Sequence, residues 1–118
     1  MVALETLAKT ALQRDGLRLR SLALDFMREQ PKLALIPRPP INDQQVLATA
    51  AALLELLAQR AGQIAPAWTR EVGPVPEPVF LLEAATRMKR LRALCESEAP
   101  EPLRKRGLYA PPEFLTFA

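Results

Sequence analysis

Apolar residues recur every three or four positions in four segments of the chain, the spacing of one face of an α-helix. The segments are residues 3–14, 17–29, 43–61 and 82–98. The most continuous stripe lies in 43–61 and consists of Val46, Leu47, Ala50, Leu53, Leu54, Leu57 and Ala61. The pattern therefore predicts four main helices.

Capping residues flank these segments at the expected places. Asn42 or Asp43 can accept from a free backbone N–H at the start of the third helix. Gly62 follows that helix, and Gly16 follows the first, where glycine can adopt a left-handed cap. Gly107 is predicted to close a short additional helical turn near the C-terminus.

Two proline-rich stretches separate the helices, "LALIPRPPI" (33–41) and "APAWTREVGPVPEPVF" (65–80). Proline disfavours regular structure there, so both are predicted to be extended. Both are also too apolar to be free linkers, and we expect them to pack on the helices. A length of 118 residues fits one domain. The predicted fold is thus a single all-α domain, 1–118, of about four helices with long proline-rich connections packed on it.

Composition supports this fold class, argues against a membrane span and gives little support to nucleic-acid binding. Leu and Ala dominate the apolar residues, and aromatic residues are only 5%, which favours helices over strands. The net charge of +3 is too small to argue for nucleic-acid binding by itself. No stretch approaches 18 uncharged apolar residues, so no membrane span is expected.

The chain has one cysteine, Cys95, and no histidine. A single thiol cannot form an internal disulfide, which favours a reducing, cytoplasmic location. Without histidine, a Cys–His or Ser–His nucleophile cannot be built from this chain alone. One cysteine plus carboxylates is also a poor zinc ligand set. We therefore predict no catalytic residues, no metal site and no cofactor.

The segment "RKRGLYAPPEFL" (104–115) combines three adjacent cations with aromatic residues. A basic and aromatic C-terminal tail can enter a groove on a partner protein, and a lone tryptophan can anchor a partner surface. The predicted partner-binding residues are Arg104, Lys105, Arg106, Tyr109, Phe114 and Trp68; Phe117 belongs to the same aromatic tail. Packing on the chain's own core, or simple solvation of the cations, is the competing interpretation.

A second cationic group comprises Arg87, Lys89, Arg90 and Arg92 on the back of the fourth predicted helix. Together with residues 104–106 these side chains could contact phosphates. Three anions, Glu96, Glu98 and Glu101, lie between the two groups and would repel the same phosphates. Nucleic-acid binding is therefore the alternative function, and solvation the simpler interpretation.

The order of several motifs carries a resemblance over residues 42–118: a Leu/Ala helix ending "RAG", then "PAWTREV" (66–72), "EPVF" (77–80) and "LRALCESEAPEPLRKRGLYAPPEFL" (91–115). This order resembles small bacterial antitoxin-like proteins encoded beside nucleotidyltransferase-like partners. Val79 departs from that pattern, which prefers tryptophan there. The resemblance implies a non-catalytic protein that binds a protein partner.

The sequence thus predicts a non-catalytic protein-interaction module, the antitoxin or accessory subunit of a two-gene bacterial system. The alternative is a nucleic-acid-binding accessory protein that uses the basic C-terminal third.

Overall fold

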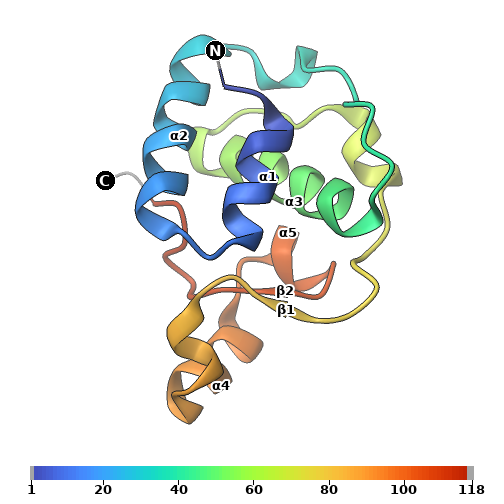
Figure 1. Ribbon diagram of the computed structural model, residues 1–118. Helices are drawn as coiled ribbons and strands as arrows, with labels where there is room; N and C mark the ends of the chain where they lie inside the picture. The colour runs from blue at the N-terminus through green and yellow to red at the C-terminus, as the bar shows by residue number, and fades with distance from the viewer. Residues whose placement is uncertain (1, 117–118) are drawn as a thin grey trace.

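Three helices form the body of the molecule: α1 (Leu4–Leu12), α2 (Gly16–Glu29) and α3 (Gln44–Ala61). The computed structural model describes residues 2–116, and most of them are helical, as predicted. Figure 1 shows α1 lying across α3, with α2 beside α1. The three helices share one hydrophobic core.

The turn between α1 and α2 differs from the prediction. Gly16 was expected to cap α1, but it is the first residue of α2, and Arg14 adopts the left-handed conformation with φ 61°. Asp15 begins α2 by accepting a hydrogen bond from the backbone N–H of Arg18 at 3.1 Å. An aspartate N-cap satisfies one of the free donors of a first helical turn, so the helix starts one residue early.

The predicted limits of α3 are confirmed. The carboxylate of Asp43 accepts from the backbone N–H groups of Gln45 and Val46 at 2.8 and 3.2 Å. At the other end Gly62 has φ 67°, a left-handed conformation that glycine adopts without steric cost. The residues between these two caps form a regular helix.

Burial of α3 extends around the whole helix rather than along one face. All residues from Val46 to Leu54 and from Leu56 to Ala58 are buried, whereas Ala61, which was expected in the stripe, is exposed. Small alanines let neighbouring elements approach the helix closely. Elements contacting α3 include α1, α5 (Glu101–Arg104) and the 3-10 turn η2 (Ala67–Glu71). Consequently α3 is the central helix of the molecule.

A short parallel strand pair was not predicted. Strand β1 (Val79–Phe80) pairs with β2 (Leu108–Tyr109) in the register Val79 with Leu108 and Phe80 with Tyr109. The backbone N–H of Val79 donates to Gly107 at 2.9 Å. Figure 1 shows the two strands side by side beneath the helical body. The extended conformation expected for 65–80 is therefore used for pairing at Val79–Phe80.

Residues 83–98, which we call the lobe, depart most from the prediction. The expected helix over 82–98 is divided into a 3-10 turn, η3 (Glu83–Thr86), and α4 (Lys89–Glu98). Ala85 and Cys95 are both buried in one small cluster with Phe80. A continuous helix would separate these two residues by about 15 Å along its axis, so the break is needed to bring them together.

The break also changes the environment of Met88. The helical pattern placed this side chain on the inner face, but it is 57% exposed. In Figure 1 α4 lies apart from the α1–α3 body, and its main packing partner is η3. The lobe thus has its own small hydrophobic cluster, formed by Phe80, Ala85 and Cys95, apart from the main core.

Candidate functional site

The three cations at 104–106 do not form one surface cluster. Arg104 is exposed, and its guanidinium donates to the carbonyl of Ser97 at 2.8 Å. The Lys105 side chain is 43% exposed and lies 3.2 Å from a carboxylate oxygen of Glu55. Arg106 is only 3% exposed. The prediction of a solvated or partner-facing cluster therefore does not hold for Arg106.

Arg106 is buried because α3 provides its counter-charge. Its Nη1 donates to Glu55 Oε1 and, at 3.0 Å, to the carbonyl of Pro102. Its Nη2 donates to the carbonyl of Thr69 at 2.6 Å. A buried guanidinium requires paired charge and hydrogen bonds. These bonds join α3, η2 and the turn after α5 at one point, so Arg106 has a structural role.

The pKa of Glu55 reflects this pairing. Burial alone raises the pKa of a carboxyl group, and it is the largest single influence on Glu55. Hydrogen bonds and charge from Arg106, followed by those from Lys105, act in the opposite direction and together lower the pKa below its ordinary value. The Thr69 hydroxyl lies 3.2 Å from Glu55 Oε2. Glu55 is therefore held ionised within a network of polar contacts.

The predicted aromatic residues are largely engaged within the chain. Tyr109 is half-buried, and its ring centroid lies 5.3 Å from that of Phe80. Phe114 is half-buried against the core, and its carbonyl accepts from Arg60 at 3.1 Å. Phe117 lies outside the described residues. The C-terminal segment, as far as residue 116, is docked on its own body.

The second cationic group, like the first, contains both paired and exposed side chains. Arg92 lies 3.3 Å from Glu96 and 4.7 Å from the centre of the Phe80 ring. Arg87, Lys89 and Arg90 are exposed and have no side-chain partner within residues 2–116. Because Arg106 is buried, the seven cations considered for phosphate binding do not form one exposed patch.

Trp68 does not act as an exposed anchor. Its indole is half-buried against the core, and Nε1–H donates to the carbonyl of Ile36 at 2.8 Å. Nearby, Gln63 Oε1 accepts from the backbone N–H of Leu33 at 3.0 Å. These two bonds fix both ends of η1 (Leu33–Leu35) against the segment that follows α3. Trp68 thus positions a neighbouring surface that the sequence did not reveal.

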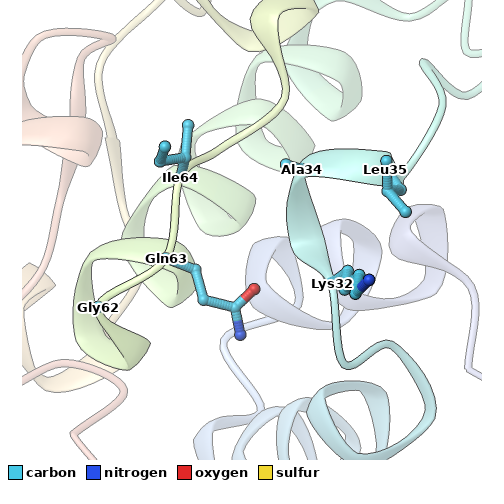
Figure 2. Close-up of a pocket in the computed structure, with 6 residues that line it drawn as sticks. All are labelled: Lys32, Ala34, Leu35, Gly62, Gln63 and Ile64. Carbon is cyan, nitrogen blue, oxygen red and sulfur yellow. The ribbon is translucent and has the colours of Figure 1, made fainter.

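That surface is an open apolar pocket of about 460 Å³. Figure 2 shows Gln63 extending from the end of α3 toward η1, with Ala34 and Leu35 across from Gly62 and Ile64. The Leu35 and Ile64 side chains are 75% and 73% exposed, although both are large and aliphatic. We call this site the Leu35–Ile64 pocket; its lining residues are Lys32, Ala34, Leu35, Gly62, Gln63 and Ile64.

The backbone around the pocket is held in place on both sides. Leu33 is fully buried, so it fixes η1 on the core while the next two residues face outward. On the other side, the left-handed conformation of Gly62 turns the chain out of α3 and places Gln63 and Ile64. The pocket is therefore formed by anchored segments, which lowers the ordering cost of binding.

Comparison with protein-family models, curated proteins and solved structures finds no match. No helix within residues 2–116 is long and apolar enough to span a membrane. The same residues contain no group of three or more Cys, Asp or Glu side chains arranged to hold a metal ion.

Proposed function

We propose that this chain is a non-catalytic protein-interaction module that binds its partner through the Leu35–Ile64 pocket. The observation that carries the proposal is the exposure of Leu35 and Ile64 around one open pocket. Contiguous exposed apolar side chains are typical of interaction sites in soluble proteins. An apolar side chain of a partner, inserted between them, would bury surface that is otherwise in contact with water.

The proline-rich connections are part of this proposal. We propose that both stay packed on the helices and keep the pocket in its binding conformation. The hydrogen bond of Trp68 joins one connection to the other, and that of Gln63 joins the first connection to the residues just after α3; both bonds support this view. Lys32 at the rim would favour a partner with acidic residues beside its apolar side chain.

The motifs at 66–72, 77–80 and 91–115 suggest the biological setting. Their resemblance to antitoxin-like proteins makes the partner, in our proposal, the product of a neighbouring gene in a two-gene bacterial module. The chain would then be the antitoxin or accessory subunit, located in the cytoplasm.

Affinity capture from the source cells tests the pocket. The double variant Leu35→Asp/Ile64→Asp should lose a partner that the parent protein retains, because two carboxylates would have to be desolvated on binding. Both residues are exposed, so the helical circular-dichroism spectrum and melting temperature should stay close to those of the parent.

Leu17→Asp is the matched control, since Leu17 is 87% exposed and lies outside the pocket. This variant should capture the partner as the parent does. Equal capture by the parent and the double variant would show that the pocket is not the binding site.

Nucleic-acid binding is a second candidate, favoured by Arg87, Lys89 and Arg90 on the lobe, which are exposed and have no side-chain partner among the described residues. Binding to duplex or single-stranded DNA or RNA should be weak, because proteins that bind nucleic acid tightly typically contact about 6–10 phosphates. A titration at low and moderate salt measures this. Sub-micromolar binding that falls steeply with salt, and is lost in Arg87→Ala/Lys89→Ala/Arg90→Ala, would establish this second function instead.

A further inference from the structure

A second, smaller pocket lies on the molecule where η2 and the following loop meet the turn after α5. Its volume is about 180 Å³, and its lining residues are Arg70, Val72, Gly73, Pro74, Lys105 and Arg106. None of them is acidic, and three are cations. It shares no residue with the Leu35–Ile64 pocket.

The charge balance around this pocket is positive. Glu55 compensates only one of the three cations, since it pairs with both Lys105 and Arg106. Glu55 lines a neighbouring pocket and not this one. Arg70 is exposed and has no side-chain partner within residues 2–116. The pocket therefore has an excess of about two positive charges.

The residues that line the pocket also carry hydrogen-bond donors that have no acceptor among the described residues. Nε of Arg106 is buried and has no hydrogen-bond partner among the described residues. The backbone N–H of Gly73 likewise donates no hydrogen bond within that part of the chain. Buried polar groups are nearly always paired, so an unpaired guanidinium nitrogen beside a pocket is unusual.

We infer that this pocket binds a doubly charged oxyanion, either inorganic phosphate or a phosphate monoester. A phosphoryl group carries about −1.5 to −2 charges at pH 7, which matches the excess of positive charge. The planar guanidinium of Arg70 can donate two parallel hydrogen bonds to such a group. Lys105 would contribute a third donor, and Lys105 and Arg106 together keep one positive charge beyond that of Glu55.

Titration of the isotope-labelled protein with sodium phosphate, at constant ionic strength maintained with sodium chloride, tests the inference. The amide signals of Gly73 and Lys105 should shift and saturate. A parallel titration with phenyl phosphate distinguishes the two sources: tighter binding of phenyl phosphate indicates a monoester, and tighter binding of phosphate indicates the free ion.

Arg70→Ala should weaken phosphate binding at least tenfold while the circular-dichroism spectrum is unchanged, because the Arg70 side chain bonds to no other residue of the described part of the chain. Arg38→Ala, which removes another exposed cation far from the lining residues in sequence, should have no effect. Arg70→Gln serves as a second variant in case the alanine variant folds poorly. Signals that do not saturate in the parent, or an equal loss in the Arg38→Ala variant, would overturn the inference.

Discussion

Glu55→Ala should destabilise the protein by about 3–5 kcal/mol, the usual cost of removing one partner of a buried ion pair. The substitution leaves the Arg106 guanidinium buried without a counter-charge, and Arg106 is only 3% exposed. A domain of this size has a total stability of roughly 5–15 kcal/mol. Urea denaturation followed by circular dichroism should therefore show a large drop in the transition midpoint.

Lys105→Ala is the control for this prediction. Lys105 contacts the same carboxylate, but its side chain is 43% exposed, and exposed ion pairs contribute about 0–1 kcal/mol. A similarly small effect of Glu55→Ala would mean that Arg106 is compensated in another way.

The pH dependence of stability provides an independent readout of the same pair. The folded-state pKa of Glu55 is lowered, so its contribution is present above the unfolded-state pKa of about 4.3 and is lost as pH falls through the folded-state value. The parent protein should lose this contribution below about pH 4. The Glu55→Ala variant should show a flatter stability profile in that range.

Leu54→Asp should unfold the protein or reduce its stability by several kcal/mol, on the order of the total. Leu54 is fully buried in the middle of α3, the central helix. A carboxylate at this position would have to be desolvated inside the hydrophobic core. Thermal unfolding should show either no cooperative transition or a much lower melting temperature.

Leu17→Asp is again the appropriate comparison, since the same chemical change at an 87% exposed side chain should leave the melting temperature almost unchanged. If Leu54→Asp melted within a few degrees of the parent, α3 would not be the centre of the core in solution.

The helical body was predictable because local signals agree along it. Asp43, the Leu/Ala stripe and Gly62 each indicate α3; Asp43 and Gly62 cap the helix as expected, and every residue of the stripe except Ala61 is buried. The division of the fourth predicted helix was not predictable, because its apolar spacing is helical throughout. It depends on Phe80, Ala85 and Cys95 sharing one cluster, which is a tertiary property.

The sites were less predictable than the helices. Glu55 is the only charged residue between Asp43 and Arg60, and a single carboxylate within such an apolar run is a signal that it has a buried partner. The sequence could not identify which cation that partner is, because three are adjacent at 104–106. Leu35 and Ile64 line one pocket because Trp68 and Gln63 bond to the two ends of η1, and the helical pattern does not encode these long-range bonds.

The strand pair β1–β2 closes the segment 81–107, which contains both the lobe and α5. Val79 donates to Gly107 before the lobe begins, and Leu81 donates to Tyr109 at 2.8 Å on the same edge. The chain between the strands is thus a closed loop. The entropic cost of closing a flexible loop rises only slowly with its length, by about 0.6 kcal/mol for each doubling. Residues 83–98 are consequently the part of the chain best suited to insertion, replacement or rapid divergence, while the body beneath them keeps its architecture.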